Sequence, residues 1–343
     1  MATASMTNPV YSVNLIKANG TKYRLKDITL DLVISHSKDE LAKKVTITLA
    51  NVKVGTKRLH QLIALKDKVY VYANTGNGNK EVFYGFVWER LFNNDADVRE
   101  IQLICYDRLI YLHKCKDNFF FKKGKKTNDI VTSIAKKWGF KIKFNYKSIS
   151  HSKLSYHNES IADVLISVLN KAKKKTGKSF VIRLEKNVIV IDTVGTNSTV
   201  YTVENKKNSI SQYYRQTMED MVTKVKIVKA ETVKKKDGEE ESGKYLTVTS
   251  VKKNTNTYGT LQEIVVKEKD EKLSEAKKEA NEILKKKAKP QAEIEVRALD
   301  NPWIKKGDKV YINSGVLKNY YIVKSIEHDT VENVMYMEVR KAS

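Results

Sequence analysis

The chain has 343 residues, of which 41% are hydrophobic and 9% aromatic, so it has enough apolar side chains for one or more cores. At ~100–200 residues per domain, this length predicts two or three domains. Three prolines and 14 glycines exclude a collagen-like or Pro/Gly-rich disordered protein. No apolar run approaches the ~18–20 residues that span a bilayer, and residues 1–9 lack the pattern of a secretory signal. We therefore expect a soluble protein without a membrane contact, made in a reducing cytoplasm.

The net charge of +24 comes mainly from lysine: 55 lysines and nine arginines stand against 40 acidic residues. Arginine favours bidentate recognition of phosphate, whereas lysine is a strongly hydrated point charge. Residues 114–178 hold 17 lysines and four acids, which is more than half of the net excess. This pattern indicates first a solvated, lysine-rich surface, and charge alone does not indicate nucleic acid as a partner. The alternative function is a lysine-rich nucleic-acid-binding protein that acts through residues 113–178.

The first 112 residues have the alternating pattern of short strands. A turn rich in Asn and Gly at 74–80 separates two of them and predicts a hairpin. Several short strands without a long amphipathic helix suggest a small antiparallel barrel or sandwich. The predicted strands are 10–15, 45–49, 69–72, 82–88 and 99–106.

The pattern changes after residue 112 to a small α/β module over about 113–200. Thr127 is expected to cap a first helix that ends at Gly139. Ser160 and Asp163 form a start similar to a capping box for a second helix, which ends at Gly177. Strands at 179–184 and 188–191 then predict a hairpin.

Strands return in the last third of the chain. A strand at 222–228 precedes an apolar-free stretch at 234–243, which we expect to be an exposed, mobile loop. A charged helix is predicted over 273–288, because a narrow apolar stripe runs along it and Pro290 follows. The remaining predicted strands are 292–296, 303–312, 320–326 and 334–339.

Candidate catalytic and metal-binding residues are few. Cys105 and Cys115 cannot form a disulfide framework or a four-ligand zinc site by themselves. His113 lies two residues from Cys115, a spacing that says nothing about a catalytic dyad. His151 with His157 lacks further ligands at metal-binding spacing, and Glu293 with Glu295 has the composition of surface ion-pair partners. The sequence thus predicts no enzyme, no catalytic or metal site and no cofactor.

An ordered set of segments resembles one known family along nearly the whole chain. It resembles the baseplate hub proteins of contractile phage tails and phage-tail-like bacteriocins of Gram-positive bacteria, the XkdQ/YqbQ type, which are similar to the late control protein D group. No single motif is specific, and the resemblance depends on the order of the set. The segments are 83–87, 106–112, 118–122, the helix 127–139, 218–226, 258–262, the helix containing 275–284, 307–310 and 323–328.

The resemblance implies an α+β, mainly β fold with two tail-tube-like antiparallel β-barrels and a small α/β module. The expected domains are a first barrel over 1–112, the lysine-rich α/β module over 113–200, and a second barrel over 201–343 with a loop and helix inserted at about 231–289. The implied function is a trimeric symmetry adaptor that joins the tail tube to the spike or tip. The implied partners are two further copies of the chain, tail tube proteins, the spike or tip, baseplate wedge proteins and the tape measure protein. The expected location is the tail baseplate of a phage or bacteriocin particle assembled in the host cytoplasm.

Overall fold

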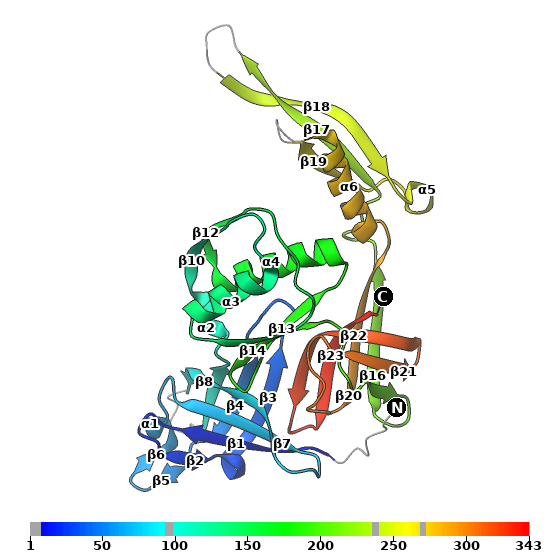
Figure 1. Cartoon of the computed structure of the whole chain (residues 1–343). Helices are drawn as coiled ribbons and strands as arrows, with labels where there is room; N and C mark the ends of the chain where they lie inside the picture. Colours follow the sequence, from blue (N-terminus) through cyan, green and yellow to red (C-terminus); the bar gives the residue numbers. More distant parts are fainter. Residues whose placement is uncertain (1–7, 93–98, 235–239, 268–271, 343) are drawn as a thin grey trace. The chain divides into compact units, whose positions relative to one another are not determined.

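The computed structural model describes residues 8–92, 99–234, 240–267 and 272–342 (Figure 1). Strands make up 50% of the structure and helices 19%, which confirms the predicted α+β, mainly β fold class. By their contacts the residues form two compact units. The first comprises residues 1–213 and 294–343, and the second comprises residues 214–293.

The first unit begins with an antiparallel sheet whose inward side chains form one hydrophobic core. Every second residue is buried along its strands, as Val45, Ile47 and Leu49 are in β4, which is the period of a sheet with one covered face. All five strands predicted in this region are confirmed. In spatial order the strands are β3 (Thr29–His36), β4 (Lys44–Ala50), β9 (Glu100–Tyr106), β8 (Lys80–Leu91), β7 (Lys68–Asn74), β1 (Val10–Ile16) and β2 (Lys22–Arg24).

Short elements connect these strands, and one glycine permits close backbone approach. A Cβ atom on Gly85 of β8 would lie 2.3 Å from the carbonyl oxygen of Tyr106, so only glycine fits between β8 and β9. The connecting elements are η1 (Lys26–Ile28), β5 (Lys53–Val54), β6 (Lys57–Arg58) and α1 (Leu59–Leu62). Closure of this sheet into a barrel stays a prediction.

The α/β module follows, and its helices bury their apolar faces in a second core. Ser160 caps α4 as predicted, because its Oγ accepts from the backbone N–H of Asp163, and Gly177 ends the helix in a left-handed conformation. The predicted cap at Thr127 is wrong: Lys126 occupies the N-cap position without a side-chain cap hydrogen bond, and the Thr127 hydroxyl donates to the carbonyl of Ile149. The elements are α2 (Ile110–Lys114), β10 (Lys116–Phe121), α3 (Thr127–Lys137), β11 (Lys141–Asn145), β12 (Leu154–Ser160), α4 (Ile161–Thr176), β13 (Phe180–Glu185) and β14 (Val188–Thr193).

The C-terminal strands form a third core, and all of its buried residues lie in the first unit. The predicted strand over 303–312 begins only at Lys309, because residues 303–308 form turns. The strands are β15 (Tyr201–Glu204), β16 (Ser209–Thr217), β20 (Gln291–Leu299), β21 (Lys309–Ser314), β22 (Leu317–Asp329) and β23 (Val334–Lys341). They pair in the order β16-β20-β23-β22, with β21 on β22 and β15 parallel to β21.

Strand β22 also joins this sheet to the N-terminal one. Its last four residues pair antiparallel with β3, from Ile326 opposite His36 to Asp329 opposite Val33. A further backbone hydrogen bond of 3.1 Å runs from the N–H of Thr330 to the carbonyl of Leu32. Two sheets with separate cores therefore share one continuous ladder.

The second unit is a three-stranded sheet with a helix on one face. Val225, Ile227 and Val265 pack from the strands against Ala276 and Ala280 of the helix. Its elements are β17 (Lys224–Lys234), β18 (Glu240–Lys252), α5 (Thr255–Tyr258), β19 (Gln262–Lys267) and α6 (Leu273–Lys287), and the sheet order is β18-β17-β19 (Figure 1).

Two expectations for this second unit have an outcome in the structure. The predicted helix over 273–288 is confirmed as α6. The loop expected over 234–243 is wrong at its ends, because Lys234 belongs to β17 and residues 240–243 belong to β18, and 235–239 lie outside the described residues. The insertion expected at about 231–289 lies inside this unit, and the predicted domain boundaries remain a proposal.

Leu32 and Leu30 of β3 offer a matched test of the N-terminal core. Leu32 is 2% exposed and Leu30 is 45% exposed. We expect Leu32→Ala to lower the free energy of unfolding by about 2–5 kcal/mol, because it leaves a cavity in a packed core. Leu30→Ala should cost less than about 1 kcal/mol. Urea unfolding followed by circular dichroism measures both, and equal losses would contradict the assignment of β3 to this core.

Candidate functional site

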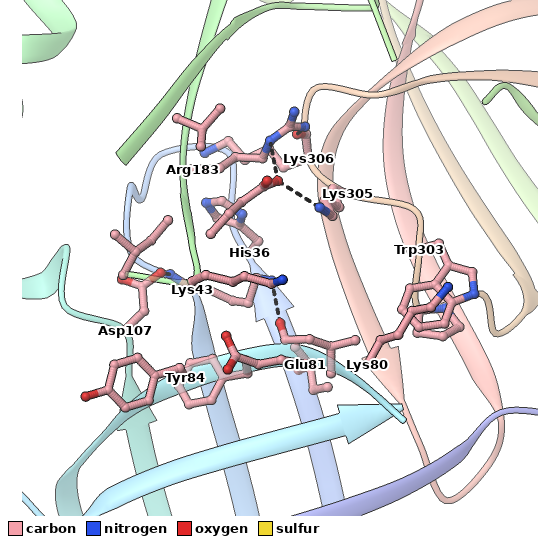
Figure 2. Close-up of a pocket in the computed structure, with 18 of the residues that line it drawn as sticks. His36, Lys43, Lys80, Glu81, Tyr84, Asp107, Arg183, Trp303, Lys305 and Lys306 are labelled. Carbon is pink, nitrogen blue, oxygen red and sulfur yellow. Dashed lines mark hydrogen bonds and ion pairs between the residues drawn. The ribbon is translucent and has the colours of Figure 1, made fainter. Parts of the chain in front are cut away.

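The first unit contains a cavity of about 990 Å³ where its three parts meet. Residues from the N-terminal sheet, from β11, β13 and β14 of the module, and from the segment before β21 line it. Figure 2 shows Arg183, Lys305 and Lys306 on one side of the cavity, and Tyr84, Glu81 and Lys80 on the opposite side. Seven cationic side chains and four carboxylates line it: Lys43, Lys80, Lys143, Arg183, Lys186, Lys305 and Lys306, with Glu81, Asp107, Glu185 and Asp192.

Lys43 and Asp107 lie on one wall of this cavity, just before β4 and just after β9. The Lys43 ammonium donates to the carbonyl of Val82 at 2.9 Å. The Asp107 carboxylate accepts from the backbone N–H of Lys43 at 3.0 Å and from that of Leu109 at 2.9 Å. Burial raises the pKa of Asp107 to about 7, against the lowering effect of these two hydrogen bonds. Burial and the charge of Lys305 lower the pKa of Lys43 to about 8.

Arg183 of β13 connects the module to the C-terminal part. Its guanidinium donates to Asp308 at 2.9 Å and to the carbonyl of Lys306 at 3.1 Å, and it also pairs with Asp192. Its Nε atom is buried and has no hydrogen-bond partner among the described residues. Gly307 allows this close approach, because a Cβ atom there would lie 2.8 Å from the side chain of Val181.

The two neighbouring lysines make further contacts across the same junction. Lys305 donates to Glu185 at 2.7 Å. Lys306 donates to three carbonyl oxygens of the β3–β4 connection, those of Ser37, Lys38 and Glu40, at 2.7 to 3.0 Å. Burial lowers the pKa of Lys306 to about 8. The 302–306 segment is thus held to both the module and the N-terminal sheet.

A buried Tyr–Asp–His cluster lies beside the cavity. The Tyr11 hydroxyl donates to Asp300, and His328 Nδ1 is 2.6 Å from the other Asp300 oxygen. Burial, followed by the charge of Asp300, raises the pKa of Tyr11 above its usual range, so the phenol keeps its proton at neutral pH. The cluster connects β1 to the C-terminal strands, and this geometry fits a structural contact better than acid–base chemistry.

The residues that the sequence singled out lie apart from this cavity. Cys105 is buried in the first core, and burial raises the pKa of its thiol. His113 Nε2 accepts from the backbone N–H of Leu41 at 3.0 Å. His151 is buried against Thr127 at 2.8 Å, whereas His157 is exposed. Glu293 pairs with Arg215 at 3.1 Å.

Two general searches of the described residues add to this picture. Within ranges 8–92, 99–234, 240–267 and 272–342, no group of three or more His, Cys, Asp or Glu residues is arranged to hold a metal ion. None of the helices in this same part of the chain is long and apolar enough to cross a membrane.

Sequence reasoning did not identify the cavity, because its residues are far apart along the chain. One signal was present. The segments 83–87, 106–112 and 307–310, which contribute to the family resemblance, contain Tyr84 and Asp107 in the wall and Asp308 bound to Arg183. What the sequence lacked was any indication that these segments meet in space.

The buried His36 makes this region sensitive to acid. Burial and the charges of Lys306, Lys43 and Arg183 lower the pKa of His36 well below its usual value, while the carbonyl of Leu41 acts in the opposite direction. In the unfolded chain the His36 side chain takes up a proton below about pH 6.5, whereas in the folded protein it stays neutral. The contribution of His36 to the free energy of unfolding is therefore complete above that pH and is lost on acidification.

We therefore expect His36→Gln to flatten the pH dependence of the free energy of unfolding between pH 6.5 and 5, where His36 contributes up to about 1.4 kcal/mol per pH unit. Urea unfolding at pH 7.5, 6.5 and 5.5 measures this slope. His157→Gln, at an exposed histidine, is the control and should keep the original slope. The assignment would be wrong if both variants behaved alike.

Comparison with known proteins identifies relatives over most of the chain. A model of the YqbQ-like family matches residues 32–340. The phage-like element PBSX protein XkdQ of Bacillus subtilis (strain 168) is 23% identical over 251 residues, which cover 71% of this chain and 72% of that protein.

Solved structures show where else this fold occurs. The 43 kDa tail protein of prophage MuSo2 from Shewanella oneidensis matches with a TM-score of 0.70 and 14% identity, over 97% of this chain and 98% of that one. A tail protein from Neisseria meningitidis MC58 matches with a TM-score of 0.66 and 13% identity, over 97% of both chains. Together with the family match, they support the coarse prediction of a structural protein of the phage-tail or baseplate class. Because the family model spans far more than half of the sequence, this chain belongs to the YqbQ-like family, as the resemblance indicated.

Proposed function

We propose that this chain is a structural baseplate hub protein of a contractile phage tail or a phage-tail-like bacteriocin. In this proposal three copies form a ring that joins the six-fold tail tube to the three-fold spike or tip. The chain performs no catalysis, and it is assembled into the particle in the host cytoplasm. Membership of the YqbQ-like family and the fold that it shares with tail proteins support this role.

One observation carries the proposal: a single chain holds two β cores that are joined by a shared ladder. The N-terminal strands enclose one core and the C-terminal strands enclose another. Three such chains would present six sheet units around an axis, which matches a six-fold tube above and a three-fold tip below. The adaptor therefore needs no conformational difference between copies, since each chain supplies two sheet units.

Strand edges provide a physical route to ring formation. In the described part of the chain, β2 and β16 end the main strand order, and β15 pairs only with β21. Exposed strand edges carry unpaired N–H and C=O groups, and pairing them with another copy would satisfy these groups and close the ring. Tail tube proteins, the spike or tip, baseplate wedge proteins and the tape measure protein are the further partners in this proposal.

A nucleic-acid-binding protein is the rival function. All 17 lysines between 114 and 178 are exposed, so they are available to phosphate as well as to water. Titration of duplex DNA at 50 to 200 mM salt separates the two roles. A steep dependence of affinity on salt with near-micromolar binding at physiological salt would favour the rival. If the chain is a hub protein, we expect weak binding of duplex DNA that physiological salt abolishes.

The oligomeric state tests the proposed role directly. We expect a species of three times the 39.3 kDa chain mass, in solution or in the assembled particle, because the adaptor needs three-fold symmetry. Light scattering after size exclusion measures the purified protein at several concentrations. Averaged electron micrographs of particles carrying a labelled chain measure its copy number and position. A monomer under all these conditions, with no label at the baseplate, would contradict the proposal.

A further inference from the structure

The cavity of the first unit contains cationic groups whose hydrogen bonds are incomplete. Among the described residues, the Lys43 ammonium makes one hydrogen bond, to Val82, although it has three donors. The Arg183 Nε is buried and has no hydrogen-bond partner among the described residues, and its nearest ion-pair contact is Glu185 Oε1 at 3.8 Å. Buried donors without partners are costly, and an anion that accepts from them would remove that cost. The geometry therefore favours an anionic ligand.

The mouth of the cavity carries positive charge from three separate elements. Lys80 begins β8, Lys143 lies in β11, and Lys186 lies in the turn between β13 and β14, and all three are exposed. The Lys80 ammonium lies 5.3 Å from the centre of the Trp303 ring. Figure 2 shows these two side chains next to each other. A ligand that contacts all three lysines must reach from the N-terminal sheet to the module.

The walls indicate what kind of anion fits. Tyr72, Val82, Tyr84 and Trp303 line the cavity beside the charged groups, so its surface is partly apolar. The volume of about 990 Å³ is far larger than one inorganic ion requires. Four carboxylates in the lining also leave a modest positive excess, which suits one or two carboxylates better than a polyphosphate backbone.

We propose that this cavity binds an acidic, partly apolar segment of another protein, with a glutamate or aspartate side chain directed at Lys43. The lysines at the mouth attract the segment, and the aromatic wall packs against its apolar residues. All lining residues belong to one chain, so the binding does not depend on the hub assembly and is testable without it.

A fluorescein-labelled hexapeptide in which glutamate and leucine alternate serves as the probe, in 150 mM NaCl with the full-length protein. We expect saturable binding by fluorescence anisotropy. A peptide in which glutamine replaces glutamate should bind about tenfold more weakly or not at all. Inorganic phosphate at equal concentration should not displace the probe.

Variants at the mouth and in the interior test the location. The triple variant Lys80→Gln, Lys143→Gln, Lys186→Gln should weaken binding about tenfold. The matched control changes three exposed lysines of the module outside the lining, Lys123, Lys136 and Lys174, to glutamine and should leave the affinity within about twofold. Lys43→Met keeps the apolar stem and should also weaken binding about tenfold.

Several results would overturn the inference. No saturable binding below 1 mM probe would exclude the site, and equal weakening by the mouth and control triples would reduce it to non-specific charge attraction. Displacement by phosphate would assign the cavity to a free oxyanion instead of a peptide. Unchanged binding by a folded Lys43→Met variant would show that Lys43 does not contact the ligand. If that variant does not fold, the triple lysine variant at the mouth still tests whether the cavity is the binding site.

Discussion

A ladder of four residue pairs between β3 and β22 joins the two halves of the first unit. The pairs run from His36 with Ile326 to Val33 with Asp329, so backbone hydrogen bonds link strands that lie almost the whole chain apart. Each sheet has its own core, and without this ladder each would end in an open strand edge. The cavity, the buried Tyr11–Asp300–His328 cluster and the contacts of Lys306 all lie close to this connection.

Charged side chains also connect the parts of the first unit that the ladder joins. Arg183 reaches Asp308, and Lys306 reaches the carbonyls before β4, so the module, the 302–306 segment and the N-terminal sheet are held at one junction. Ion pairs withdrawn from water gain little net stability but are costly to leave incomplete, so they fix position more than they add energy. The same desolvation favours the neutral form of each group, so it raises the pKa of Asp107 and lowers the pKa values of Lys43 and His36.

Local pattern was enough to predict most elements of this fold. Alternating apolar residues located β4 and β7, and the Ser160 cap with Gly177 gave both ends of α4, because these signals act over a few residues. The cap predicted at Thr127 was wrong because its hydroxyl donates to the carbonyl of Ile149, which is distant in sequence. Only the folded structure shows that this carbonyl lies within reach. The cavity could not be predicted for the same reason: Lys43, Arg183 and Lys306 come together through long-range pairing, and no spacing in the sequence encodes that meeting.

The long separation of β3 and β22 along the chain has a consequence for biosynthesis. Strand β3 is translated almost 300 residues before the segment of β22 that pairs with it. At about 5–20 residues per second, the β3 edge of the N-terminal sheet therefore stays unpaired for roughly 15–60 s of synthesis. During that interval a row of backbone groups is open to any neighbouring nascent chain. Chains emerging side by side on one messenger RNA thus meet while this edge is uncovered, until residues 326–330 are made and pair with it.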